Sequence, residues 1–155
     1  MIDDFQITEN FSFYELTDSE HHPELVEENR VYAQGYMKQL KYTCCTLEEI
    51  RAILGVPCKP TSGIRCPKLN RAVGGSATGG HPKGLCCDFI PIGMDVKDAF
   101  TKIQANKHKC PSLKKCIYES VNGVIWLHIE TKTEFNQPQQ FFTTSNGKTY
   151  TEIKA

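Results

Sequence analysis

The chain has 155 residues, of which 39% are hydrophobic, and this length supports one core of ordinary size. Its 18 lysines and arginines balance 18 aspartates and glutamates, so there is no basic field of the kind that binds nucleic acid. No run of 18 apolar residues is present, which argues against a membrane span, and the acidic start MIDDFQITEN lacks the apolar segment of a signal peptide. We therefore expect one domain, made in the cytoplasm and monomeric.

Helices are predicted in the first half of the chain. A short helix follows Ser12, and a longer one begins near Pro23 and ends just before Gly55, with Gly35 as the place where it divides. In its second part apolar residues recur every three or four positions and form one face, namely Tyr36, Leu40, Cys44, Leu47, Ile50 and Leu54. This face is expected to pack on the core.

The middle of the chain predicts short elements. An extended segment over residues 56–62 precedes a turn at Gly63, and the segment PKLNRAV forms a small helix closed by two glycines. The apolar stretch LCCDFI, bounded by Gly84 and Pro91, indicates a buried strand. A third helix begins after Asp95, which is a good N-cap.

Two hairpins are predicted at the end of the chain. KCIYESVNGVIWLHIE turns at Asn122-Gly123 in a type I′ turn, and QQFFTTSNGKTYTEI turns at Asn146-Gly147. Helices that precede an antiparallel sheet indicate an α+β domain, with the N-terminal helices packed on a small, mainly antiparallel sheet.

The turn of the first hairpin predicts which side chains share a face. It places Glu119 opposite Trp126 and Ile117 opposite His128. Glu119, Trp126 and His128 then project together, with Glu119 and His128 about 7–8 Å apart on the diagonal. In the LCCDFI strand the same alternation puts Asp88 on one face with Cys86.

Two histidines and an aspartate are candidate metal ligands. His81 and Asp88 lie in GGHPKGLCCDFIP, and His128 lies in IWLHIE. Zinc accepts imidazole and carboxylate ligands, and a set of three protein ligands leaves a fourth position open for water, as in catalytic sites. A carboxylate between Cys87 and Phe89 also needs a partner if it is buried.

The stretch KPTSGIRCPKLNRAVGGSATGGHPKGLCCDF, followed by YES and WLH, resembles the zinc D-Ala-D-Ala carboxypeptidases and related phage endolysins. The resemblance extends from about residue 11 to the last hairpin. It implies a single zinc peptidase domain over residues 1–155, with a core of about 11–153 and a hedgehog/DD-peptidase-like fold. The YES…H arrangement also resembles the hedgehog signalling domain, which has the same fold.

The resemblance implies roles for particular residues. His81, Asp88 and His128 would hold one Zn²⁺ ion, which lowers the pKa of a water molecule and polarises the scissile carbonyl. Glu119 would act as the general base that takes the proton of that water and hands it to the leaving amine.

The implied substrate is the peptide stem of bacterial peptidoglycan. Arg65 would bind its carboxylate through the two-pronged guanidinium, and Ser76 would be a weaker substrate contact. The activity would be that of a D,D-carboxypeptidase or an endolysin-like peptidase. Without a signal peptide, the protein would reach the cell wall as a phage lysin released through a membrane lesion.

Three positions depart from the family pattern. Gly79 stands where the family usually has serine, Ile125 where many relatives carry an acid, and Cys86 where the family has alanine. Because Ile125 cannot act as a base, Glu119 is the residue expected to be the general base. The Cys86 thiol has three interpretations: inert packing, a neighbour of the ligands, or an extra soft ligand that blocks the open position.

Other interpretations remain beside the enzymatic one. Glu119 could be an exposed strand residue, Arg65 could tie down its loop, and Trp126 suits either a substrate platform or sheet packing. The whole chain could be a non-catalytic binding or structural module that retains the zinc fold, as hedgehog domains do.

The eight cysteines are many for a chain made in a reducing cytoplasm. None forms a C-x-x-C pair, so a structural zinc site of four cysteines is poorly supported. Reduced thiols that fill the core are the simplest interpretation. In an oxidising medium Cys110–Cys116 and Cys58–Cys66 would be the first pairs to consider.

Overall fold

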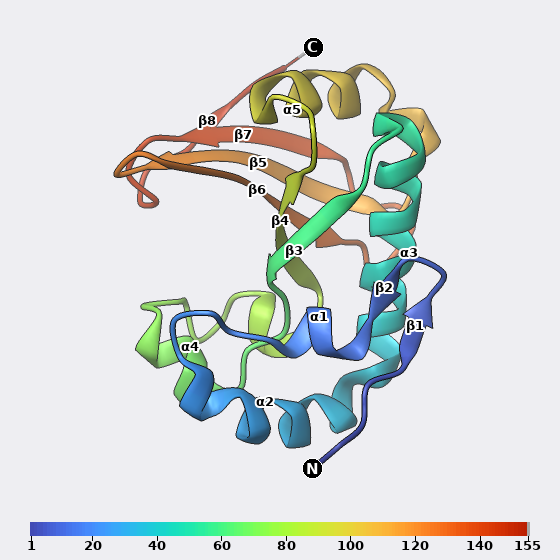
Figure 1. Cartoon of the computed structure of the whole chain (residues 1–155). Coiled ribbons are helices and arrows are strands. Elements are labelled where there is room, and N and C mark those ends of the chain that lie inside the picture. Colours follow the sequence, from blue (N-terminus) through green and yellow to red (C-terminus); the bar gives the residue numbers. More distant parts are fainter. Residues whose placement is uncertain (155) are drawn as a thin grey trace.

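A computed structural model of the chain, which describes residues 1–154, has the predicted α+β architecture (Figure 1). Its main sheet has six strands in the order β3-β4-β6-β5-β7-β8. All neighbours are antiparallel except β5 and β7, which run parallel, so the sheet is mainly antiparallel as predicted. The strands are β3 (Cys58–Ser62), β4 (Cys86–Pro91), β5 (Leu113–Val121), β6 (Val124–Thr131), β7 (Gln140–Thr144) and β8 (Thr151–Glu152).

The helices begin and end close to the predicted residues. In α1 (Phe13–Thr17) Ser12 and Glu15 form a capping box, which satisfies free amides at the N-terminus. The long helix is divided near Gly35, as predicted, and Gly55 ends it in the left-handed conformation with φ 72°. Its pieces are η1 (Pro23–Leu25), α2 (Val26–Ala33), η2 (Gln34–Tyr36) and α3 (Met37–Leu54).

The remaining elements are short. Asp95 caps α5 by accepting a hydrogen bond from the amide of Asp98, as its position predicted. The hairpin β1–β2 was not predicted, because strands of two or three residues are too short to show an alternating pattern. These elements are α4 (Pro67–Ala72), η3 (His81–Lys83), α5 (Val96–Ala105), η4 (Lys107–Lys109), β1 (Gln6–Thr8) and β2 (Phe11–Ser12).

The core lies between one face of the sheet and the helices α3 and α5. The predicted apolar face of α3 is buried from Leu40 to Leu54, and Tyr36 packs at its edge. Cys87 and Phe89 of β4 and Leu127 and Ile129 of β6 join it, and burial of a large apolar side chain contributes about 1.5–3 kcal/mol. The alternate residues of β4 and β6 therefore face away from this core.

The cysteines behave as core residues. All eight are free thiols, and seven of them are buried, Cys45 being the exposed one. Neither Cys110–Cys116 nor Cys58–Cys66 is bonded in residues 1–154. No helix in this part of the chain is long and apolar enough to cross a membrane.

The first hairpin has the predicted register. Asn122 and Gly123 have φ values of 52° and 80°, the positive values that a type I′ turn requires. Glu119 pairs with Trp126, and Ile117 pairs with His128. The second hairpin, β7–β8, is also present, but its connection is a longer loop over residues 145–150 in which Gly147 has φ 69°.

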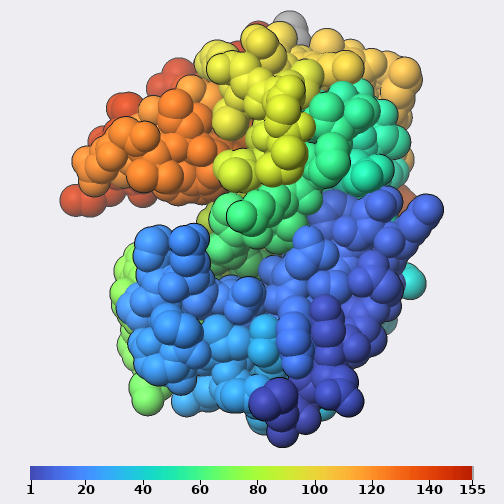
Figure 2. Space-filling view, in the orientation of Figure 1, coloured from blue at the N-terminus to red at the C-terminus, as the bar shows by residue number. Residues whose placement is uncertain are grey.

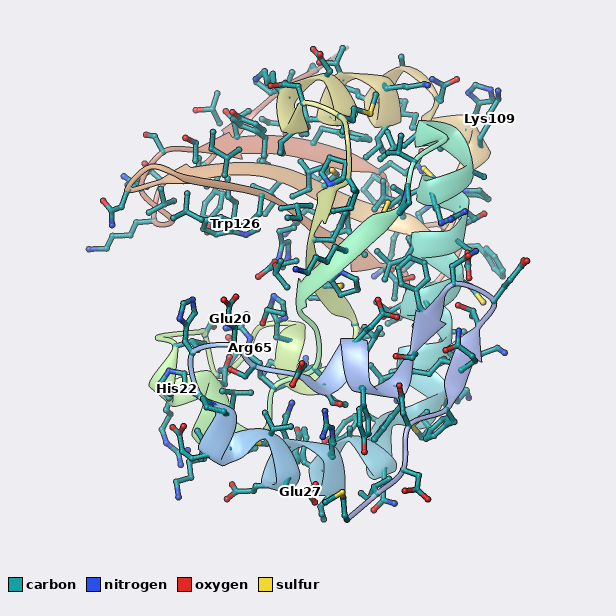
Figure 3. The ribbon with its side chains drawn as sticks, in the orientation of Figure 1. Glu20, His22, Glu27, Arg65, Lys109 and Trp126 are labelled. Carbon is teal, nitrogen blue, oxygen red and sulfur yellow. The ribbon has the colours of Figure 1, made fainter. Side chains whose placement is uncertain are left out.

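A cleft of about 980 Å³ opens on the other side of the sheet. Figure 2 shows the hollow between the hairpin β5–β6, in orange, and the N-terminal part, in blue. In Figure 3 Arg65 and Trp126 lie on its opposite walls, Arg65 after β3 and Trp126 on β6. The fold therefore brings the face of the sheet that carries Asp88 and His128 opposite the segment SGIRC.

The segment SGIRC is held by a buried asparagine that sequence reasoning did not single out. Asn29 of α2 is fully buried, and its amide donates hydrogen bonds to the carbonyls of Thr17 (2.8 Å) and Ile64 (2.9 Å). Its side-chain oxygen accepts one from the amide of Cys66 (2.7 Å). These bonds fix the wall of the cleft that carries Arg65.

Replacement of Asn29 by alanine is expected to lower the free energy of unfolding by about 3 kcal/mol, because buried backbone groups lose their partners. Urea unfolding followed by circular dichroism measures the change. Val31→Ala, which alters an exposed side chain of the same helix, should change it by less than about 0.5 kcal/mol. Equal stabilities for Asn29→Ala and Val31→Ala would contradict the proposed role of Asn29.

Candidate metal centre

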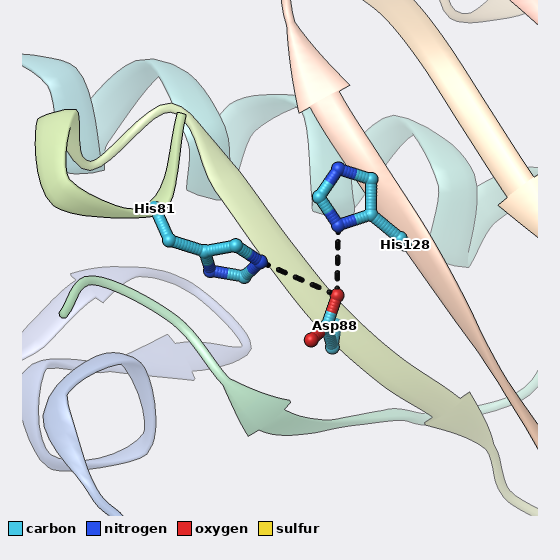
Figure 4. A group of neighbouring side chains, drawn as sticks. All are labelled: His81, Asp88 and His128. Atoms are coloured by element: carbon cyan, nitrogen blue, oxygen red, sulfur yellow. Dashed lines mark hydrogen bonds and ion pairs between the residues drawn. The ribbon is translucent and has the colours of Figure 1, made fainter. Parts of the chain in front are cut away.

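The three predicted ligands lie side by side (Figure 4), and all three line the cleft. Asp88 and His128 are direct partners on the neighbouring strands β4 and β6, and His81 comes from η3. Oδ1 of Asp88 lies 2.9 Å from Nδ1 of His128 and 3.4 Å from Nε2 of His81. All three donor atoms lie within 4.8 Å of one another.

This donor set fits a zinc ion. Atoms that each bind zinc at about 2 Å in a tetrahedral arrangement lie roughly 3.3 Å apart, close to the separations found here. Nδ1 of His81 donates a hydrogen bond to the carbonyl of Gly63 at 2.7 Å, which places the ring proton there and leaves the lone pair on Nε2. His81 thus has the orienting partner that metal-binding histidines usually have.

The three side chains also determine one another's charge. Burial would raise the pKa of Asp88, but His81 and His128 outweigh it and hold this pKa well below its usual range. Burial lowers the pKa of His81. Burial acts the same way on His128, but the hydrogen bond to Asp88 and the neighbouring Cys86 raise its pKa well above the ordinary value.

Zinc binding is therefore expected to depend on pH. At neutral pH the raised pKa of His128 keeps a proton on the metal-free protein, and a zinc ion must displace it. As the pH falls below this pKa, the apparent zinc affinity should fall about tenfold per unit. Calorimetric titrations between pH 6 and 8 in buffers of different ionisation enthalpy measure the affinity and the protons released. An affinity independent of pH, with no proton release, would contradict this assignment.

Glu119 lies on the same cleft, as the register of its hairpin predicted. It is partly buried opposite Trp126 on β6 and beside Thr144 on β7. Burial raises the pKa of Glu119, and the negative charge of Asp88 raises it further. A carboxylate with a raised pKa close to the ligand cluster is suited to accept a proton from a water molecule there. The exposed-strand interpretation of Glu119 does not fit this environment.

Arg65 reaches the cleft from the opposite wall. Burial lowers the pKa of its guanidinium, and among the described residues its Nε has no hydrogen-bond partner. A side chain at Gly75 would overlap Oδ1 of Asn70 and approach Nη1 of Arg65 to 2.9 Å, so this glycine leaves room for the guanidinium. The backbone of Arg65 also ties the loop together, because its amide donates to the carbonyl of His81 at 3.1 Å.

Ser76, the other predicted substrate contact, is among the residues that line the cleft. Its side chain is exposed, and its hydroxyl lies 3.2 Å from that of Thr78. Its carbonyl accepts a hydrogen bond from the amide of Asn70 at 3.0 Å. The loop is therefore anchored to α4 through its backbone, and the hydroxyl of Ser76 faces outward.

Two polar residues of the cleft, Asn70 and Tyr150, were not found by sequence reasoning. In the described part of the chain, Nε1 of Trp126 and Oδ1 of Asn70 are buried without a hydrogen-bond partner. Tyr150 enters the cleft from the loop before β8. No local pattern signals Asn70 or Tyr150, since their position depends on contacts between distant segments. Trp126 lies on the predicted face and lines the cleft opposite Glu119.

Comparison with known proteins agrees with this site. A search of curated proteins finds no match to the chain. A family model described as Peptidase M15 matches residues 19–129, a span that contains Arg65, the three candidate ligands and Glu119. M15 peptidases are zinc-dependent, and the candidate ligands provide the donors that zinc requires. The chain therefore belongs to the peptidase M15 family of zinc metallopeptidases.

Proposed function

We propose that this protein hydrolyses the peptide stem of bacterial peptidoglycan, as a D,D-carboxypeptidase or an endolysin-like endopeptidase. The observation that carries the proposal is the shared cleft: a three-ligand site, a carboxylate beside it and a guanidinium across from it. The cleft has a volume of about 980 Å³, and both His81 and Glu119 are on its wall. Membership of the M15 family supports a peptide as the substrate.

Each residue has a distinct task in the proposed reaction. A zinc ion bound to His81, Asp88 and His128 would lower the pKa of water and polarise the scissile carbonyl. Glu119 accepts the proton of the attacking water and passes it to the leaving amine. The carbonyl of Gly63 orients the imidazole of His81, so that the lone pair of its Nε2 is in place before substrate binds.

Arg65 would bind an anionic group of the substrate. Its side chain is partly buried and lines the cleft, and a guanidinium offers a carboxylate several donors in a fixed geometry. A carboxypeptidase needs such a group, because its substrate ends in a free carboxylate next to the bond that is cut. The retention of Glu119 and of this cleft favours the enzyme over a non-catalytic zinc module.

The proposed role of Arg65 predicts a difference between two substrates. Arg65→Gln should raise KM about 10-fold to 100-fold for a synthetic stem peptide with a free C-terminal carboxylate, since a hydrogen bond to a charged group contributes about 1.5–3 kcal/mol. KM for the same peptide with a C-terminal amide should change little. Arg71→Gln, on the exposed side of α4, is the matched control. Equal effects of Arg65→Gln on both peptides would instead assign Arg65 to another part of the substrate.

Delivery to the substrate is a further part of the proposal. We propose that residues 1–155 act as one monomeric domain that reaches the cell wall as a released phage lysin. The single large hydrophobic cluster that joins the helices to the sheet supports the one-domain part of this proposal.

A further inference from the structure

A second group of metal-binding side chains lies next to the first. Cys86, His128 and Glu130 each offer a donor atom, and these atoms lie within 4.8 Å of one another. Cys86 and Glu130 are direct partners on β4 and β6, two residues along each strand from the pair Asp88 and His128. All three line the cleft, so a small ion can reach them from solvent.

The space around the thiol depends on a glycine. Cys86 is only 1% exposed, and a side chain at Gly80 would overlap its Sγ and come within 3.7 Å of the carboxylate carbon of Glu130. Oε1 of Glu130 forms an ion pair with Lys114 at 3.2 Å, which leaves Oε2 for another partner. The thiol, the free carboxylate oxygen and the imidazole therefore gather in one enclosed corner.

His128 is common to both groups, and its two nitrogens point in different directions. Nδ1 faces Asp88, whereas the second nitrogen, Nε2, points away from Asp88 and His81 (Figure 4). A neutral imidazole has a proton on one nitrogen and a lone pair on the other. When Nδ1 binds a metal, Nε2 carries the proton; when Nε2 binds a metal, Nδ1 carries it and donates to Asp88.

We propose that Cys86, His128 and Glu130 form a second site for a soft divalent cation such as Cd²⁺, and that its occupation excludes zinc from the first site. Thiolate sulfur prefers soft metal ions, whereas the first group offers only nitrogen and oxygen. On binding, the thiol of Cys86 and the imidazolium of His128 each release a proton to water, and a metal–sulfur and a metal–nitrogen bond form. A metal ion in the first site needs the tautomer of His128 with its proton on Nε2, whereas a metal ion in the second site needs the tautomer with its proton on Nδ1.

Cadmium titration tests this proposal without measuring hydrolysis, so it is independent of the proposed peptidase activity. The starting protein is metal-free and carries Cys45→Ser, which removes the exposed thiol. The thiolate-to-cadmium charge-transfer absorption in the ultraviolet should rise and saturate at one equivalent per chain. Adding Cys86→Ser should lower this absorption at least tenfold. Absorption that is unchanged by Cys86→Ser would overturn the proposal.

A second readout tests the exclusion of zinc. One equivalent of Cd²⁺ added to the zinc-loaded protein should release zinc to a chromogenic chelator, and Cys86→Ser should reduce the release at least tenfold. Glu130→Gln, which keeps the shape of the side chain, should weaken cadmium binding about tenfold and leave zinc affinity unchanged. If Cys86→Ser does not fold, this second variant tests the proposed cadmium site in its place. Full cadmium–thiolate absorption with zinc fully retained would show two independent sites and overturn the proposed exclusion.

Discussion

Replacement of Glu119 by glutamine is expected to lower kcat for peptide hydrolysis by about 10²–10⁴-fold, the usual contribution of a general base. Glutamine has nearly the same shape but cannot accept the proton of the attacking water. KM and the zinc content should stay close to those of the wild type, because Glu119 is not among the three ligands. Steady-state kinetics on stem peptides and metal analysis of the same sample measure these quantities.

The control for this variant is Glu152→Gln, which changes an exposed glutamate on the edge strand β8. It should leave kcat within a factor of about two. Loss of zinc from Glu119→Gln would show that Glu119 is a ligand and not the base. Retention of full activity would place the base elsewhere on the cleft wall.

Replacement of Asp88 by alanine is expected to weaken zinc binding more than about 100-fold and to abolish activity at ordinary zinc concentrations. Asp88 contacts both imidazoles, at 2.9 and 3.4 Å. Its loss removes one of the three ligands, and loss even of a partner that only orients a ligand usually costs 10–100-fold in metal affinity. Competition with a chelator of known affinity measures the effect.

Asp98→Ala is the matched control for this variant, since Asp98 is exposed on α5 and away from the cleft. Its zinc affinity should equal that of the wild type. If Asp88→Ala binds zinc as tightly as the wild type does, the ion is held by another group. Cys86, His128 and Glu130 would then be the first candidates.

Local patterns were sufficient to predict which side chains share a face within the first hairpin and within β4. The turn at Asn122-Gly123 determines the register of its hairpin, but the pairing of β4 with β6, which puts Asp88 beside His128, became evident only in the structure. The motifs of the family identified His81 as a further ligand, because its position in space depends on a loop and not on strand alternation. The boundaries of the helices followed from Pro23, Gly35, Gly55 and the capping residues.

Contacts between distant segments could not be predicted in this way. Asn29 holds a loop more than thirty residues away, and nothing in its neighbourhood marks it as buried. The same holds for Tyr150, which enters the cleft from the end of the chain. Cys86 was predicted to face the metal side, but its partner Glu130 became evident only when β4 and β6 were aligned. Such features depend on how strands and loops pack, which no local pattern specifies.

The central claim is that this M15 site cleaves peptidoglycan stems with Glu119 as the base. Its most direct test is mass spectrometry of purified peptidoglycan incubated with zinc-loaded protein. The wild type should release D-alanine or split the stem peptides, and Glu119→Gln should do so at less than about 1% of that rate. A wild-type protein that binds zinc but leaves every stem peptide intact would contradict the claim.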